Sequence, residues 1–105
     1  MPGAQCPRFT YEPPSFHIFS NNTGGSLACS AQGIPNPRLS WVDGQENVVR
    51  TVPGLRHVLE NGTIIFPPFP AGGYDASIHQ QGYRCTASSS AGTVVSRMAR
   101  IRTGE

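Results

Sequence analysis

The sequence predicts an all-β domain built as a sandwich of two antiparallel sheets. Two observations lead to this prediction. Short runs rich in β-branched and aromatic residues recur along the chain, and Gly, Pro, Asn and Asp turn signals separate them at a spacing of roughly 8–12 residues. In addition, no window of about 11 residues keeps the apolar spacing of an amphipathic helix without a Pro or Gly inside it.

Eight runs are expected to form the strands. They cover residues 16–19, 26–31, 38–42, 48–52, 56–59, 63–66, 82–88 and 93–102. Asn61-Gly62, between two of these runs, is the clearest hairpin signal, because both residues tolerate the positive φ that tight hairpin turns need. We expect one domain over residues 9–103, with residues 1–8 as a terminal segment.

Composition excludes several classes of protein. The chain has 105 residues, of which 13% are charged, against roughly 25% in an average domain, and every basic residue is Arg. The net charge is only +2, and the Arg residues are scattered, unlike those of an electrostatic nucleic-acid or membrane binder. No apolar run approaches the ~18 residues of a transmembrane helix.

Four residues suggest a particular kind of sandwich. Cys29, Trp41 and Cys85 stand in separate strand-like runs, and Tyr83 precedes Cys85 by two positions. This arrangement resembles an immunoglobulin domain of the I-set, in which the two Cys join the sheets, the Trp packs on the disulfide and the Tyr forms a tyrosine corner. The resemblance therefore implies a Cys29–Cys85 disulfide, with Trp41 and Tyr83 in the core.

A more specific resemblance covers nearly the whole chain after Cys6. It is to the first immunoglobulin domain of arthropod Dscam (Down syndrome cell adhesion molecule) receptors, including the shortened receptors of chelicerates. The matching motifs are Gly33-x-Pro35-x-Pro37-x-x-x-Trp41, Val52-Pro53-Gly54-Leu55-Arg56 and Gly62-x-x-x-Phe66-Pro67-Pro68-Phe69. One departure is His79, which stands where many I-set domains have Asp.

The Dscam resemblance implies an extracellular module of a single-pass cell-surface receptor. Such receptors exist as many isoforms and bind copies of themselves on opposing cells, so the implied partner is the same isoform. A two-fold, antiparallel pairing of one sheet face is the simplest geometry for self-recognition. The alternative is heterophilic binding of a microbial or guidance ligand. A structural I-set module of an intracellular filament protein is less consistent with the two potential glycosylation sites and the absence of Lys.

Strand alternation predicts which side chains form the self-contact face. With Cys29 pointing inward, Leu27 and Ala31 also point inward; in the later runs Val58, Ile64 and Phe66 do so. The outward residues of these runs form a face that is more apolar than solvation requires. The candidate interface residues are Ser26, Ala28, Ser30, His57, Leu59, Thr63 and Ile65.

Several other residues carry weaker expectations. Asn21 and Asn61 each begin an Asn-x-Thr glycosylation motif, and Asn21 is the preferred acceptor of the two. Cys6 is expected to be a free thiol, and Arg56 and Asp75 are candidates for a salt bridge at the base of the sandwich. Alternation places Arg100 and Arg102 on one outward face, either as a solvated edge or as a site for an acidic partner.

The sequence predicts no enzymatic activity, metal site or cofactor. It contains no nucleophile elbow, no phosphate-binding Gly loop and no His-Glu metal motif. The three His residues lack the spacing of zinc ligands.

Overall fold

The computed structural model describes residues 3–104 as ten strands and two very short helices. The strands are β1 (Gln5–Tyr11), β2 (Phe16–Ser20), β3 (Gly25–Ala28), β4 (Ser30–Ile34), β5 (Arg38–Asp43), β6 (His57–Val58), β7 (Thr63–Phe66), β8 (Gly82–Ser89), β9 (Gly92–Val95) and β10 (Ala99–Gly104). A 3-10 helix, η1 (Ala71–Gly73), and one turn of α-helix, α1 (Ala76–His79), lie between β7 and β8. Both helices are far shorter than a membrane-crossing helix, and no described segment qualifies as one.

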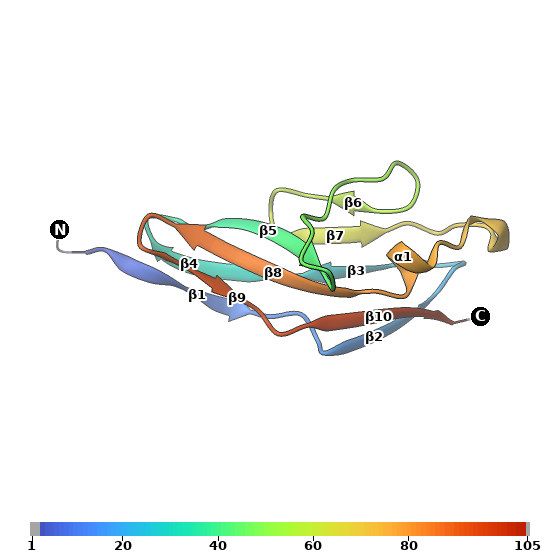
Figure 1. Ribbon diagram of the computed structural model, residues 1–105, viewed down its shortest axis with the longest axis horizontal. Coiled ribbons are helices and arrows are strands. Elements are labelled where there is room, and N and C mark those ends of the chain that lie inside the picture. The colour runs from blue at the N-terminus through green and yellow to red at the C-terminus, as the bar shows by residue number, and fades with distance from the viewer. Residues whose placement is uncertain (1–2, 105) are drawn as a thin grey trace.

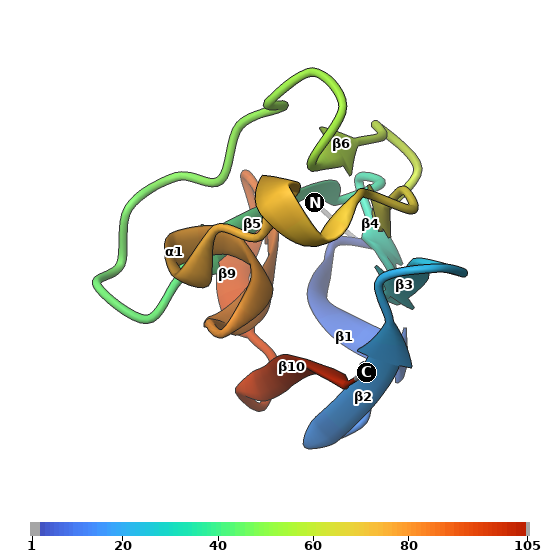
Figure 2. The ribbon, with the colours of Figure 1, turned by 90° about the vertical axis from the view of Figure 1, so that its right-hand side faces the viewer.

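The strands form two layers (Figures 1 and 2). One layer contains β3, β7 and β6 in that order and, continuing past Cys29, the antiparallel pair β1–β4. The other contains β2, β10, β8 and β5 in order, with β9 also paired to β8. Viewed end-on in Figure 2, β3 and β6 lie on one side and β5, β9 and β10 on the other. The predicted all-β sandwich is therefore confirmed.

The space between the layers is filled by the side chains that strand alternation predicts to point inward. Leu27, Ile64 and Phe66 of the first layer are almost fully buried, as are Trp41 and Tyr83 of the second. Val58, which the sequence also placed inward, is half-buried and packs against this core. Burial of apolar surface at roughly 25 cal/mol per Å² makes these contacts the main stabilising contribution to the fold.

Three of the expected strand runs differ from the structure. Residues 48–52 form only isolated bridges, Val42 with Val48 and Val52 with Arg56, because this segment crosses from one layer to the other. The run 26–31 is divided at Cys29 into β3 and β4, and the run 93–102 is divided at residues 96–98 into β9 and β10. In the second case, the Ser96 amide still donates to the Cys85 carbonyl, so the chain stays close to β8.

The first strand was not expected from the sequence. β1 begins at Gln5, ahead of the boundary at residue 9, and pairs with β4 from Gln5↔Ile34 to Tyr11↔Ser30. Pro7 obscured this strand, since Pro lacks the amide proton of a regular ladder. A Pro is tolerated here because β1 pairs on one side only.

The Asn61-Gly62 signal does mark a hairpin, between β6 and β7, although its connection is longer than two residues. The Leu59 amide donates to the Thr63 carbonyl, and Gly62 has a φ of 94°. An added Cβ at Gly62 would meet the carbonyl oxygen of Cys29. Gly is therefore required both by the backbone conformation and by the close approach of β3 and β4.

Candidate functional site

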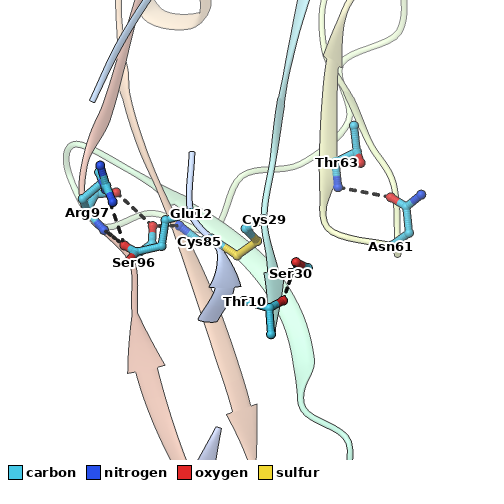
Figure 3. Close-up of a disulfide and its surroundings, with 9 residues drawn as sticks. All are labelled: Thr10, Glu12, Cys29, Ser30, Asn61, Thr63, Cys85, Ser96 and Arg97. Atoms are coloured by element: carbon cyan, nitrogen blue, oxygen red, sulfur yellow. Dashed lines mark hydrogen bonds and ion pairs between the residues drawn. A yellow bond between two sulfur atoms is a disulfide. The ribbon is translucent and has the colours of Figure 1, made fainter. Parts of the chain in front are cut away.

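The disulfide and its surroundings fix the two layers relative to each other (Figure 3). Cys29, between β3 and β4, is bonded to Cys85 of β8, and Trp41 lies opposite Cys85 in the β5–β8 ladder. Trp41 and Cys85 have no exposed surface. The Ser96 hydroxyl accepts a hydrogen bond from the Cys85 amide at 2.9 Å and thereby holds the end of β9 against β8. The disulfide implied by the immunoglobulin resemblance is confirmed.

Tyr83 forms the expected tyrosine corner. Its hydroxyl donates to the carbonyl of Ile78 at 2.8 Å and accepts from Arg56 Nη1 at 3.2 Å. Burial raises the pKa of Tyr83 above its ordinary value, although the hydrogen bond from Arg56 acts in the opposite direction. The phenol therefore stays protonated and donates its hydrogen bond to the Ile78 carbonyl.

The expected salt bridge between Arg56 and Asp75 is absent from the described part of the chain. The Arg56 guanidinium instead binds Tyr83 and the Arg50 carbonyl, the latter at 2.9 Å. Asp75 is the N-cap of α1, where its Oδ1 accepts from the Ser77 amide at 3.0 Å and from the Ser77 hydroxyl at 2.6 Å. These hydrogen bonds lower the pKa of Asp75. The carboxylate is satisfied by the first turn of the helix, so it needs no Arg partner.

His79 is part of the same turn. Its Nδ1 accepts a hydrogen bond from the Asp75 amide at 2.9 Å, and its ring stacks on Phe69 with the ring centroids 4.0 Å apart. The side chain is fully buried, and burial lowers the pKa of His79 despite the nearby Asp75 carboxylate. A ring nitrogen that accepts a hydrogen bond carries no proton, so this geometry requires the neutral form of the His79 ring.

The candidate self-contact residues share one outer face. In the β3–β7–β6 sheet, Ile65 lies between Ser26 on one neighbouring strand and His57 on the other, and Thr63 is paired with Ala28. Leu59, which directly follows β6, lies beside Thr63, because the Leu59 amide donates to the Thr63 carbonyl. Leu59 and Ile65 are 40% and 38% exposed. The structure thus brings these six residues together on the solvent side of the first layer, which we call the neutral face.

Ser30, the seventh candidate, lies further along the same layer. It belongs to β4, and its hydroxyl shares a 2.7 Å hydrogen bond with the hydroxyl of Thr10 on β1 (Figure 3). It therefore stands at the boundary between the β3–β7–β6 sheet and the β1–β4 pair, at the edge of the neutral face.

The two glycosylation motifs occupy different environments. The Asn21 amide nitrogen donates to the Phe69 carbonyl at 3.0 Å, and its side chain is partly buried. Asn61 is exposed, and its Oδ1 accepts from the Thr63 amide at 3.2 Å. In Figure 3 the Asn61 amide nitrogen points away from the disulfide. Of the two asparagines, Asn61 is therefore the more accessible.

Cys6 is an exposed free cysteine whose thiol donates to the Ala91 carbonyl at 3.3 Å. No group of three or more metal-binding side chains occurs within the described residues.

The opposite outer face carries exposed apolar side chains that strand alternation did not predict. On β2, which pairs in parallel with β10, Phe16 and Ile18 are 52% and 56% exposed and lie beside Arg100 and Arg102. Ala99 and Ile101 are buried, so the alternation that predicted outward Arg100 and Arg102 is confirmed. The apolar neighbours on β2 were missed because β2 reads as a half-buried strand with no signal for which apolar residues face outward.

Comparison with known proteins identifies the family. No family model matches the chain. It is 45% identical to cell adhesion molecule Dscam2 of Drosophila melanogaster over 91% of its length, and 36% identical to human cell adhesion molecule DSCAM over 81%. The crystal structure of the N-terminal four immunoglobulin domains of Dscam1 isoform 9.44 matches 97% of the chain with a TM-score of 0.94 and 36% identity. The chain is a Dscam-like immunoglobulin domain.

This Dscam-like domain is a small part of the proteins it resembles. It spans 5% of Drosophila Dscam2, 4% of human DSCAM and 26% of the four-domain Dscam1 chain. A Dscam structure described as the basis for isoform specificity covers 94% of the chain with a TM-score of 0.90 and 37% identity. The resemblance that the sequence motifs suggested is therefore confirmed.

Proposed function

We propose that this Dscam-like domain is an extracellular adhesion module that binds a second copy of itself through the neutral face. The domain would be the first immunoglobulin domain of a single-pass cell-surface receptor, with the same isoform on an opposing cell as its partner. The support comes from relatives that are cell adhesion molecules, and from one structural observation, the character of the neutral face.

A two-fold interface places each residue near its own copy, so a charged side chain close to the axis meets a like charge. None of the six residues of the neutral face, nor Ser30 at its edge, is Asp, Glu, Lys or Arg, and His57 is the only titratable side chain among them. Small side chains such as Ser26 and Ala28 permit close approach, while Leu59 and Ile65 supply exposed apolar surface. These properties favour pairing of this face with itself.

The expected contact is weak. The described chain exposes 6233 Å² in all, and one sheet face offers roughly 500–800 Å² per partner, at or below the standard size of a stable interface. Adhesion would then depend on many receptors engaging at one cell contact. Isoform specificity would come from a few side chains that fit or clash with their own copy.

Sedimentation equilibrium of the purified chain tests the proposal. Leu59→Asp and Ile65→Asp each place a carboxylate opposite or near its own copy, so both should abolish self-association. Val95→Asp is the matched control, because Val95 is 54% exposed on β9 of the other layer. Association that persists in both face variants, or a wild-type chain that stays monomeric at millimolar concentration, would contradict the proposal; a monomer would favour the heterophilic alternative.

We also propose Asn61 as the glycosylation site of this module. It lies at the tip of the β6–β7 hairpin, next to Leu59 and Thr63, so a glycan there would bound the neutral face at one end. The glycan would have to project away from a paired copy. If a glycan at Asn61 were instead directed across the face, self-contact would have to use the opposite layer.

A further inference from the structure

The outer face of the second layer differs from the neutral face in charge. Four of the chain's eight basic residues occupy outward strand positions there, and none of the outward positions of β2, β5, β8, β9 and β10 that the structure describes is acidic. The four are Arg38, Arg84, Arg100 and Arg102. In a two-fold self-contact these cations would repel their copies, so this face fits a partner of the opposite charge.

Arg100 and Arg102 lie together at one end of this basic face, because Arg100 pairs with Gly82 at the start of β8 whereas Arg38 pairs with Ser88 near its end. They are outward neighbours on β10, roughly 6.6 Å apart at about 3.3 Å per residue. Among the described residues, no carboxylate lies within ion-pair distance of either guanidinium; the ion pair that the structure does show joins Arg97 to Glu12. Both guanidinium groups can therefore donate hydrogen bonds to the oxygens of a carboxylate or a sulfate group.

Arg102 separates two hollows in the surface. One has a volume of about 300 Å³ and is lined by Phe16, Gln80, Gln81, Gly82 and Arg100 as well as Arg102. The other, about 660 Å³, lies at the end of the sandwich, where Asn21, Asn22 and Tyr74 line it together with Arg102. Each hollow thus combines an exposed aromatic ring, side-chain amides and a guanidinium.

We propose that this surface binds an acidic polysaccharide, with Arg100 and Arg102 holding its sulfate or carboxylate groups. The side-chain amides of Asn22 and Gln80 can both donate and accept, which suits sugar hydroxyls, whereas the Gln81 amide is engaged with Gly44, Gly82 and Ser77. The half-exposed ring of Phe16 offers an apolar surface for the C–H face of a sugar ring. A nucleic acid or an acidic peptide would use the charge of the two arginines but not the amide-lined hollows on either side of them.

Calorimetric titration with a heparin octasaccharide at about 0.15 M salt tests the site. The double variant Arg100→Gln/Arg102→Gln should weaken binding about tenfold or more, since each removes a charge-assisted hydrogen bond. The matched control Arg8→Gln/Arg50→Gln removes the same charge from two exposed positions outside the basic face and should change the affinity less than about twofold. Phe16→Ala should weaken binding without changing its dependence on salt, because the ring contributes no charge.

Heparin stripped of its sulfates separates the two anion types: retained binding assigns the site to carboxylates, and lost binding assigns it to sulfates. Three results would overturn the proposal. They are equal losses in the two double variants, no binding by the wild-type chain, and binding of a poly-glutamate peptide or single-stranded DNA as tight as that of heparin. All the substituted side chains are exposed, and circular dichroism would verify that each variant is folded.

The site is independent of self-association. Leu59→Asp should keep full heparin affinity, and Arg100→Gln/Arg102→Gln should keep the self-association of the wild type. Loss of one activity therefore leaves the other measurable, and failure of either proposal is distinguishable from failure of the other.

Discussion

Tyr83 and Ile78 are joined by a buried hydrogen bond, in which the Tyr83 hydroxyl donates to the Ile78 carbonyl at 2.8 Å. This bond connects the start of β8 to α1, and Arg56, directly before β6, donates a second hydrogen bond to the same hydroxyl. One phenol oxygen thus ties the short connection between α1 and β8 to Arg56, which lies 27 positions earlier in the sequence.

Tyr83→Phe should lower the free energy of unfolding by about 1–3 kcal/mol. The substitution keeps the ring but leaves the Ile78 carbonyl and an Arg56 N–H without their partner, and unsatisfied buried groups carry a cost of this size. Urea denaturation measures the change. Tyr74→Phe is the control, because the Tyr74 hydroxyl bonds Gln80 at the surface and its loss should change stability by less than about 0.5 kcal/mol. Equal effects in the two variants would contradict the importance of the corner.

Stability should fall as pH falls below about 6.5, the ordinary pKa of histidine. The pKa of His79 is lower in the folded chain because the ring is buried. The unfolded chain therefore takes up a proton first, and acid favours unfolding. Stability from this group is fully present above the unfolded pKa and is lost progressively as pH falls toward the folded pKa. Protonation of Nδ1 would also break the hydrogen bond from the Asp75 amide.

Urea denaturation at several pH values between about 7.5 and 4.5 measures this loss. His79→Gln keeps a hydrogen-bond acceptor but cannot titrate, so its stability should change much less over the range. The pKa of Asp75 is lowered from 3.8, so its own contribution is lost in a more acidic range. A variant whose stability falls with pH as steeply as that of the wild type would assign the effect to another group.

Removal of the Cys29–Cys85 disulfide should cost about 4 kcal/mol. The disulfide closes a loop with a sequence separation of 56, and the chain-entropy model assigns a stabilisation of this size to such a loop. The variant Cys29→Ala/Cys85→Ala, compared with the wild type by thermal and urea unfolding, measures the loss. Cys6→Ala is the control, because Cys6 is a free, exposed cysteine; a comparable loss in Cys6→Ala would contradict the assignment.

Substitution of the two glycosylation-motif asparagines should have opposite consequences. Asn61→Gln should remove the glycan from the secreted protein and leave stability nearly unchanged. Asn21→Ala should leave the glycan mass unchanged and lower stability by about 1 kcal/mol, because it removes the hydrogen bond to the Phe69 carbonyl. Intact-mass spectrometry and urea denaturation read out the two effects. A glycan found on Asn21 would contradict the preference for Asn61.

The sequence determined the fold class, the disulfide framework and which side chains of the central strands point into the core. Alternation was sufficient for Leu27, Ile64 and Phe66 because a strand with one buried face has a side-chain period of two residues. The resemblance carried by Cys29, Trp41, Tyr83 and Cys85 was sufficient for the immunoglobulin arrangement: Trp41 lies opposite Cys85 in the ladder between β5 and β8, and Cys29 is bonded to Cys85 from the other layer.

Only the tertiary structure decided where polar side chains found their partners. Arg56 and Asp75 looked like a salt bridge, yet Arg56 binds Tyr83 while Asp75 caps α1, because local hydrogen bonds within a turn compete successfully with a distant ion pair. The tertiary structure likewise placed Phe16 and Ile18 beside Arg100 and Arg102 through a parallel pairing of the two ends of the chain. Sequence periodicity describes one strand at a time, so the pairing that creates a surface lies outside what it can specify.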